Sequence, residues 1–351
     1  MINYKKLKNV GIAGFGAYIP YLRITTDEIA ETWQKNGKII AGSLGVIKKA
    51  IGGRDEDCIT MACQAGLLAL KMANIERQKI GACFMGSESF PYAVKPSSTV
   101  LADILQIGSE YFSADLQFAC KAGTAGVQIV CAMIEAGMID CGLAVGSDKS
   151  QAKPSDALEF TAGSGAGALI LSNTPDNWIA KVDCTFSSSS DTPDFWRREK
   201  QDYPTHGGRF SGEPAYFTQI IQASKLLFEK TRTTAKDYDW VIFHSPNKKF
   251  PEKVAGMLGF TKDQLKYSLP VEGIGNPYSA SSLISLVNVL ENAKPKDKIF
   301  LTSYGSGAGS DSFSITTTDL LVKKRKDSLK QMLKNTKEIN YTEYLKTRNL
   351  L

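Results

Sequence analysis

Histidine is scarce in this chain of 351 residues, which contains only His206 and His244. Chemistry that depends on an imidazole therefore has two candidates. No stretch approaches the ~18–20 consecutive apolar residues of a membrane-spanning helix. The apolar run 10–20 contains three glycines and no small-residue cleavage site, so we expect a first β-strand there rather than a signal peptide. These absences predict a cytoplasmic protein with no membrane contact.

Cysteine is the second residue whose pattern excludes classes of protein. The chain has seven cysteines, an odd number, and none of them forms a C-x-x-C pair. A disulfide framework and a zinc site both lack support, and we predict no metal. Most of the cysteines are expected to be small buried hydrophobic residues in a reduced protein.

Charge is balanced over most of the chain. The formal net charge is +6, and residues 322–351 carry nine Lys or Arg against three Asp or Glu, so the other 321 residues hold 33 of each sign. This distribution argues against a nucleic-acid-binding surface but leaves room for a local basic patch. We interpret the tail segment KKRKDSLKQMLK as the solvated face of a helix.

Strand and helix patterns alternate along the chain, as in α/β proteins with parallel strand pairs. We expect helices at 55–74, 121–138, 224–232 and 279–293, and strands at 80–86, 141–147, 166–172, 239–245 and 298–305.

The two halves of the chain repeat this order with similar spacing. In each half a helix precedes a strand, a second helix precedes another strand, and a glycine-rich turn leads into a last strand. The repeat predicts a duplicated fold joined near residues 173–177, with an N-terminal half at 1–174 and a C-terminal half at 175–351.

Two residues of the first half are candidates for chemistry. Cys120 lies in LQFACKAGTAGVQ, just before small residues that can start a helix, and the positive end of a helix dipole favours a nucleophilic thiolate. Glu88 follows a strand in CFMGSESF, where apolar neighbours can raise the pKa of a general acid or base. The alternatives are a buried structural cysteine and an ordinary loop carboxylate.

Two residues of the second half occupy similar places. His244 ends the strand DWVIFHS and faces the crevice where α/β proteins bind ligands. Asn276 lies in EGIGNPYSASSL, where its amide can donate to a carbonyl oxygen or a water. The alternatives are a surface histidine and a turn asparagine. Lys248, Lys249 and Lys253 are candidates to bind phosphates, or form a solvated cluster.

The glycine-rich segment SYGSGAGSD, residues 303–311, presents backbone N–H groups without side-chain bulk. Such a loop can supply half of an oxyanion hole. It lacks the G-x-x-x-x-G-K-[ST] pattern, so we discount a nucleotide-binding P-loop.

In this order, the features resemble the thiolase superfamily and, within it, archaeal-type hydroxymethylglutaryl-CoA synthases. The resemblance rests on Cys120, His244 and Asn276, on Glu88 in GSES, and on the segments FHSPNKK, GNPYSAS and SYGSGAG. It covers roughly residues 8–320 and implies a thiolase-like duplicated βαβαβαββ fold in five layers, α-β-α-β-α. CKAG and HGGRFSGEPAYF depart somewhat from the eukaryotic pattern, which affects fine substrate contacts.

The resemblance also implies a reaction of the mevalonate pathway of isoprenoid synthesis. Cys120 would accept an acetyl group from acetyl-CoA, Glu88 would remove a methyl proton, and His244 would polarise the ketone of acetoacetyl-CoA. Hydrolysis would then release 3-hydroxy-3-methylglutaryl-CoA. The backbone N–H groups of Cys120 and Ser306 would hold the thioester oxygen. The implied substrate-binding residues are Asn276, Gly305, Ser306, Lys248, Lys249, Lys253 and Arg209.

No cofactor is implied beyond the CoA thioesters themselves. The superfamily implies a homodimer, and the archaeal branch implies a complex with acetoacetyl-CoA thiolase and a small zinc-ribbon/OB-fold bridging protein. Two alternatives stay open: a condensing enzyme like ketoacyl synthase III, which would not need Glu88, and a non-catalytic acyl-CoA-binding scaffold of the same fold. A thiolase fits less well, because it would need a second cysteine near the C-terminus and none follows Cys184.

Overall fold

The computed structural model describes residues 6–351 as strands and helices that alternate over most of their length. The strands are β1 (Gly11–Tyr18), β2 (Leu22–Thr25), β3 (Lys48–Ile51), β4 (Ile80–Gly86), β5 (Phe112–Leu116), β6 (Cys141–Lys149), β7 (Ser164–Ser172), β8 (Ala180–Ser189), β9 (Phe195–Trp196), β10 (Thr205–His206), β11 (Trp240–Phe243), β12 (Lys298–Thr302), β13 (Gly309–Thr317) and β14 (Lys337–Glu338). The helices are α1 (Thr26–Thr32), α2 (Gly37–Leu44), α3 (Cys58–Ala73), α4 (Ser97–Ile104), α5 (Ala122–Glu135), α6 (Phe217–Thr231), α7 (Lys249–Leu258), α8 (Val271–Ile274), α9 (Ser281–Asn292), α10 (Leu320–Lys324), α11 (Ser328–Lys334) and α12 (Tyr341–Thr347).

Nine strands form one mixed sheet whose two parts repeat each other. The order β1-β7-β6-β4-β5 in the first part returns as β8-β13-β12-β11 in the second. The pairs β4–β6 and β11–β12 are parallel, whereas β6–β7 and β12–β13 are antiparallel. The predicted duplicated α/β order is therefore confirmed, although the second part has no counterpart of β5 among the described residues.

The two parts of the sheet meet at β1 and β8, which pair through two residues each. Residues 173–177, where the sequence predicts the join, lie between β7 and β8. The division into halves at 1–174 and 175–351 stays a prediction, and the first five residues lie outside the described part of the chain.

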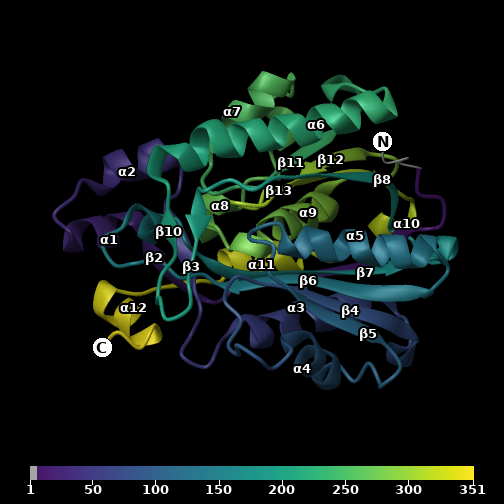
Figure 1. Cartoon of the computed structure of the whole chain (residues 1–351), viewed down its shortest axis with the longest axis horizontal. Helices are drawn as coiled ribbons and strands as arrows, with labels where there is room; N and C mark the ends of the chain where they lie inside the picture. Colours follow the sequence, from purple (N-terminus) through teal and green to yellow (C-terminus); the bar gives the residue numbers. More distant parts are fainter. Residues whose placement is uncertain (1–5) are drawn as a thin grey trace.

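Helices cover both outer faces of the sheet and fill the space between its two parts (Figure 1). Helices α3 and α4 pack on the outer face of the first part, and α6 packs on that of the second. Helices α5 and α9 contact each other, and α9 contacts strands of both parts. Helix α5 packs on strands of the first part and reaches the second through Gln128, which donates to Thr185 of β8. The layers therefore run helix, sheet, helix, sheet, helix, as predicted.

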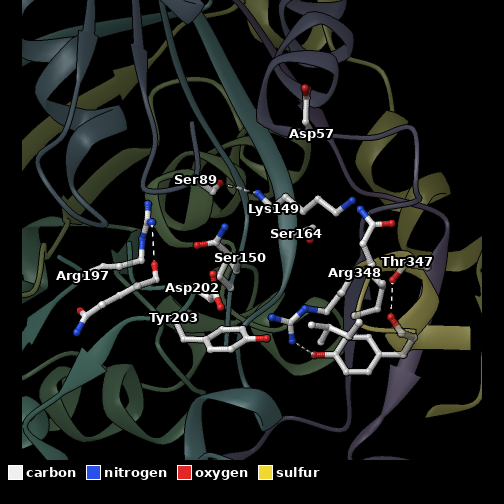
Figure 2. A pocket seen from close by; sticks show the side chains of 18 residues that line it. Asp57, Ser89, Lys149, Ser150, Ser164, Arg197, Asp202, Tyr203, Thr347 and Arg348 are labelled. Atoms are coloured by element: carbon white, nitrogen blue, oxygen red, sulfur yellow. Dashed lines mark hydrogen bonds between the residues drawn. The ribbon is translucent and has the colours of Figure 1, made fainter. Parts of the chain in front are cut away.

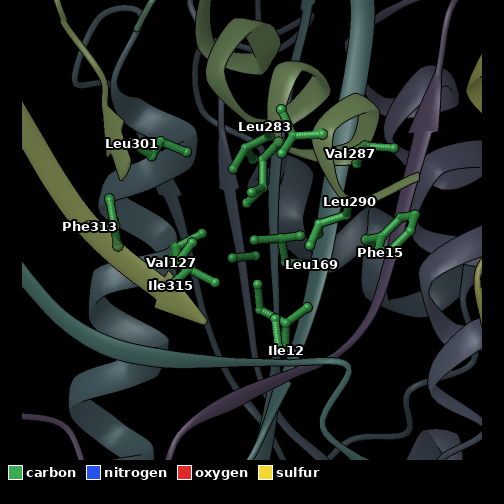
Figure 3. Close-up of a cluster of buried hydrophobic side chains, with 14 of the residues drawn as sticks. Ile12, Phe15, Val127, Leu169, Leu283, Val287, Leu290, Leu301, Phe313 and Ile315 are labelled. Carbon is green, nitrogen blue, oxygen red and sulfur yellow. The ribbon is translucent and has the colours of Figure 1, made fainter. Parts of the chain in front are cut away.

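The apolar faces of the two central helices explain why the parts stay together. Leu283, Val287 and Leu290 of α9 pack with Val127 of α5 and with Leu169 of β7 between the two sheet layers (Figure 3). All of these side chains are almost completely buried. Burial of a side chain of this size stabilises a protein by ~1.5–3 kcal/mol, so this cluster fixes the positions of both central helices.

The starts of the central helices differ from the start of an outer one. Asp57 caps α3 by accepting from the backbone N–H of Thr60. Helix α5 has no side-chain cap, and neither does α9. Their first N–H groups and the positive ends of their dipoles are thus left toward the interior of the molecule.

The lysine-rich tail folds back onto the body. Lys330 and Lys334 of α11 are exposed, as expected for a solvated helix face. Leu329, on the same helix, is buried in the main hydrophobic cluster. Further along, β14 pairs with β2, and Tyr341 and Tyr344 of α12 pack into a separate cluster with α1. None of the helices in residues 6–351 is long and apolar enough to cross a membrane.

A buried polar network holds α12 in place. The carboxylate of Glu159, which is fully buried, accepts from the Tyr341 hydroxyl (2.8 Å) and from the Trp33 indole N–H (3.0 Å). Lys49 donates to the backbone oxygen of Glu159 and to the Tyr344 hydroxyl, and burial lowers the pKa of this ammonium to about 7. Removing the Tyr341 hydroxyl would leave one oxygen of the buried Glu159 side chain without its hydrogen bond.

We predict that Tyr341→Phe lowers the free energy of unfolding by about 1–3 kcal/mol, because the Glu159 carboxylate loses a buried donor. Chemical denaturation measures this change. Tyr21→Phe is the matched control, since Tyr21 is 48% exposed and its substitution should fall within about 0.5 kcal/mol of the parent. Equal stability of the two variants would contradict the network as described.

Candidate active site

Glu88 and Cys120 meet where β4 ends and α5 begins. The Glu88 carboxyl lies beside the Cys120 thiol. Cys120 is 5% exposed, Glu88 is partly exposed, and the buried Oε1 of Glu88 has no hydrogen-bond partner in residues 6–351. Burial, helped by the nearby charge of Asp148, raises the pKa of Glu88 to about 8. Burial and the charge of Glu88 raise the pKa of the Cys120 thiol well above its ordinary value. The pair is therefore a thiol beside a carboxyl that titrates near neutral pH.

Asp148, near the end of β6, accepts hydrogen bonds from the loop that carries Glu88. Its Oδ1 accepts from the Glu88 N–H (2.8 Å) and from the hydroxyls of Ser87 (2.8 Å) and Ser89 (2.7 Å). Its Oδ2 accepts from the N–H (2.9 Å) and hydroxyl (2.6 Å) of Ser279. One buried carboxylate thus joins the loop that carries Glu88 to the turn that precedes α9.

His244 follows β11 and is 1% exposed. Burial lowers the pKa of its imidazole to about 3, so the ring is neutral near pH 7, and its Nδ1 has no hydrogen-bond partner in the described part of the chain. The ring centroid lies 6.2 Å from that of Tyr304, whose hydroxyl donates to Asp194 (2.6 Å). The Tyr216 hydroxyl donates to the His244 backbone oxygen (2.6 Å). A hydrogen bond thus holds the His244 backbone in place, whereas its ring Nδ1 is available to a ligand.

Asn276 is buried in the turn before α9. Its Oδ1 accepts from the Tyr278 N–H (3.0 Å), and its backbone oxygen accepts from the Gly163 N–H (2.9 Å). No partner for its Nδ2 is found within residues 6–351, so this amide keeps a donor. Tyr278 packs against Cys120, which brings the turn to the nucleophile.

The glycine-rich loop packs directly on the turn that carries Cys120. A Cβ added at Gly305 would lie 2.7 Å from the Phe118 carbonyl oxygen and 2.8 Å from Cγ of Lys121, so only glycine fits. The N–H of Gly307 donates to Asp194 (2.7 Å), whereas the N–H of Ser306 has no partner in residues 6–351. A free backbone donor thus lies beside the nucleophile's turn.

Two cavities open beside Glu88. One, of about 620 Å³, is lined by Glu88, Ala119, Tyr278 and Ser306. The other, of about 540 Å³, is lined by the cationic side chains of Lys149, Arg197 and Arg348 and shares Ser89, Gln151 and Arg197 with the first. Figure 2 shows the Arg348 guanidinium beside Tyr203, at the wall that the tail supplies. Lys149, at the end of β6, donates to two backbone oxygens of the loop before α3.

The lysines that the sequence analysis proposed as phosphate ligands lie outside both cavities. Lys248 pairs with Glu272 (2.9 Å), Lys253 with Glu213 (3.3 Å), and the half-exposed Lys249 only loosely with Glu252 (3.8 Å). They and Arg209, which is exposed, line neither cavity.

His206 lies on β10 and contacts Asp156 (3.1 Å). All seven cysteines are free thiols, and all seven are buried, as the sequence predicted for most of them. No group of three or more metal-binding side chains occurs in residues 6–351.

Sequence reasoning missed Asp148, Asp194 and Tyr304. Asp148 directly follows the strand expected at 141–147, so the carboxyl end of a strand was an available signal. Nothing local marks Asp194, because its partners Tyr304 and Gly307 are more than a hundred residues away.

We predict that the Glu88→Gln variant becomes more stable relative to wild type as the pH rises. A folded-state pKa of about 8 exceeds the ordinary value of 4.5, so the native wild type retains a proton that the unfolded chain loses between these values. Wild-type stability attributable to this group is full below pH 4.5 and is lost as the pH rises through 8, whereas glutamine does not titrate. The difference should grow by about 2–4 kcal/mol between pH 5 and 8.5.

Chemical denaturation at both pH values measures this difference, with Glu110→Gln on an exposed loop as the control. A difference for Glu88→Gln that stayed constant with pH would rule out a neutral, buried carboxyl at this position.

The chain matches two family models and many relatives. The model described as 3-Oxoacyl-[acyl-carrier-protein (ACP)] synthase III matches residues 114–188, and that of its C-terminal part matches residues 228–316. A hydroxymethylglutaryl-CoA synthase of Archaeoglobus fulgidus is 48% identical over 97% of this chain and 98% of its own length. One of Methanosphaera stadtmanae is 48% identical over 96% of this chain and 97% of its own length.

Solved structures agree with this fold. MvaS in complex with 3-hydroxy-3-methylglutaryl coenzyme A superposes with a TM-score of 0.88 at 22% identity, covering 99% of this chain and 93% of that one. The 3-oxoacyl-(acyl carrier protein) synthase III of Pseudomonas aeruginosa PAO1 gives 0.81 at 20% identity, covering 89% and 99%. With relatives near half identity over almost its whole length, the chain belongs to the hydroxymethylglutaryl-CoA synthases, a family of condensing acyltransferases.

Proposed function

We propose that this chain condenses acetyl-CoA with acetoacetyl-CoA and water to give 3-hydroxy-3-methylglutaryl-CoA and free CoA, through an acetyl-Cys120 intermediate. The observation that carries the proposal is the Glu88 carboxyl, which lies beside the Cys120 thiol, lines the adjoining cavity and has a pKa raised to about 8. Removal of a proton from an acetyl methyl needs a base, and a carboxylate whose conjugate acid has a raised pKa is a stronger base than an ordinary one. A decarboxylating condensation needs no such base.

Acetylation comes first. The Cys120 sulfur attacks the thioester carbon of acetyl-CoA, and CoA leaves as its thiol after taking up a proton. The uncapped start of α5 favours negative charge at this position. The N–H groups of Cys120 and Ser306 hold the oxygen that becomes negative, and one such donor typically contributes ~10²–10³-fold to the rate.

Condensation then joins the acetyl group on Cys120 to acetoacetyl-CoA. Glu88 in its ionised form takes a proton from the acetyl methyl, and the resulting enolate attacks the ketone carbon of acetoacetyl-CoA. Neutral His244 donates its ring N–H to the ketone oxygen, while the Nδ2 of Asn276 supplies a second donor. As the alkoxide takes up the ring proton, His244 regains one from the protonated Glu88, so both groups return to their starting forms. A positioned base of this kind contributes ~10²–10⁴-fold. Water then cleaves the thioester and frees Cys120.

The surroundings fit this chemistry. Burial shifts both Glu88 and His244 toward their neutral forms, so neither group carries a permanent charge in a dry site. Neutral imidazole still carries one ring N–H as a donor, and Glu88 needs to ionise only for the proton-transfer step. No cofactor besides the CoA thioesters takes part in these steps.

A homodimer in the cytoplasm, acting in the mevalonate pathway, completes the proposal. Strand β5 is the outer edge of the sheet and, within residues 6–351, pairs with β4 alone, and Phe112 at its start is 59% exposed. An unpaired edge with an exposed aromatic side chain is suited to pairing with a second copy. The complex with acetoacetyl-CoA thiolase and a zinc-ribbon/OB-fold protein stays a prediction from the resemblance.

We predict that Glu88→Gln separates the two chemical steps. Intact-mass spectrometry after mixing with acetyl-CoA should show one acetyl group on Cys120, and a chase with acetoacetyl-CoA should discharge it at least ~10²-fold more slowly than in wild type. Glu110→Gln should behave as wild type, and Cys120→Ser should acquire no acetyl group. Condensation by Glu88→Gln at the wild-type rate would refute the role of Glu88.

The chase also tests the alternatives. Discharge of the acetyl group only by a malonyl thioester would favour a ketoacyl-synthase-like enzyme. Binding of CoA without any acetylation of Cys120 would favour a scaffold.

We further predict that Lys249→Glu raises the KM for acetyl-CoA several-fold, because Lys249 is the least engaged of the three candidate phosphate ligands. The KM for an S-acetyl pantetheine substrate, which lacks the nucleotide phosphates, should stay the same, and added salt should reduce the difference. Lys262→Glu, at an exposed site without an ion pair in residues 6–351, is the control. An equal rise for both substrates would argue against a phosphate contact.

A further inference from the structure

A buried ion pair lies directly behind the nucleophile. The Lys121 ammonium, one residue after Cys120, contacts the Asp311 carboxylate at 2.5 Å, and the two side chains are 1% and 0% exposed. Lys121 precedes α5 in the first part of the fold, and Asp311 lies on β13 in the second. The pair therefore links the two parts of the fold beside the active site.

Both charges of this pair are fully engaged. Asp311 also accepts from the hydroxyls of Thr124 (2.9 Å) and Ser187. The Lys121 ammonium lies 3.9 Å from the centroid of the Phe118 ring. Since a buried pair is often no more stabilising than apolar residues of the same volume, stability alone does not account for its presence.

The pair encloses the two ends of the glycine-rich loop. Ser303 donates its N–H to the Asp311 backbone oxygen (2.8 Å), and its hydroxyl bonds to that of Thr124 (2.8 Å). Within the loop, Gly305 lies against Cγ of Lys121 so closely that a Cβ would be 2.8 Å away. The aliphatic stem of Lys121 thus forms the surface on which the loop rests, and its charged end holds the strand that the loop enters.

We propose that Lys121 and Asp311 are positioning residues that set the separation of the two oxyanion-binding N–H groups, those of Cys120 and Ser306. One donor belongs to the turn that Lys121 ends, and the other belongs to the loop that Asp311 closes. Donors on different parts of a fold have no short covalent path that fixes their distance. A displacement of about 1 Å can cost ~10²-fold in rate, so a rigid tie between the two segments has a direct catalytic effect.

The proposal rests on the proposed function, because it assumes that a thioester oxygen occupies this position. It differs from an electrostatic role, in which the ammonium would lower the pKa of the Cys120 thiol. The pair carries no net charge, and its effect should therefore fall on acyl transfer and not on ionisation of the thiol. Alkylation by iodoacetamide, which needs the thiolate but no oxyanion hole, separates the two.

The test compares wild type with the double variant Lys121→Met/Asp311→Leu, which removes the pair without leaving a buried unpaired charge, and with Lys121→Arg, which keeps it. We expect acetylation of Cys120 by acetyl-CoA to fall ~10–100-fold in the double variant, with partial recovery in Lys121→Arg. The pH profile of iodoacetamide alkylation and the KM for acetyl-CoA should stay close to those of wild type. Condensation of acetyl-enzyme should fall by a similar factor, because the enolate uses the same donors.

Each other outcome overturns the inference. Acetylation at the wild-type rate in a folded double variant would show that the pair does not position the donors. A shifted alkylation profile, with acetylation slowed in proportion, would assign the pair an electrostatic role. A loss of acetylation, alkylation and thermal stability together would make the role purely structural. Wild type that alkylates but is never acetylated would instead refute the proposed function, and with it the oxyanion hole.

Discussion

The arrangement of this site depends on the buried carboxylate of Asp148. It accepts from the loop that carries Glu88 and from Ser279, which begins the approach to α9. A buried carboxylate with fewer donors would be strongly destabilising, so the two segments cannot separate without exposing it or leaving it unsatisfied. The same negative charge raises the pKa of Glu88. One group therefore fixes the position of the base and contributes to its protonation state.

Close backbone contacts make this arrangement possible. A Cβ at Gly86 would lie 2.3 Å from the carbonyl carbon of Ala122, and one at Gly146 would lie 2.3 Å from the Ser279 oxygen. The ends of β4 and β6 thus touch the starts of the central helices without an intervening side chain. This closeness places Glu88 and Cys120 against the packed interior, where burial shifts the pKa values of Glu88 and His244 toward their neutral forms. The close packing of strands on helices thus contributes to the shifted pKa values of the acid-base groups.

The sequence predicted the elements well and the long-range partners poorly. Strand β4 has the predicted bounds, and α5 begins one residue after the predicted start, because hydrophobic periodicity is a local property. Glu88 and Cys120, which the sequence could only propose separately, are in contact. Lys248 and Lys253 were selected on charge alone, and the carboxylates that engage them, on Glu272 and Glu213, lie 24 and 40 positions away. No local sequence pattern predicts such ion pairs. In the same way, no local pattern predicts that β14 of the tail pairs with β2.

The duplication explains why these particular positions carry chemistry. Strands β4 and β11 are equivalent, and Glu88 and His244 follow them; α5 and α9 are equivalent, and Cys120 and Asn276 precede them. A repeated unit brings equivalent loops to the same place, where the carboxyl ends of the parallel strands meet the starts of the central helices. The two copies carry different functional groups at these positions. The first supplies a thiol and a carboxyl, and the second supplies an imidazole and an amide. Nucleophile and base on one side and neutral donors on the other suit a reaction in which a carbanion formed on one acyl group attacks the carbonyl of another.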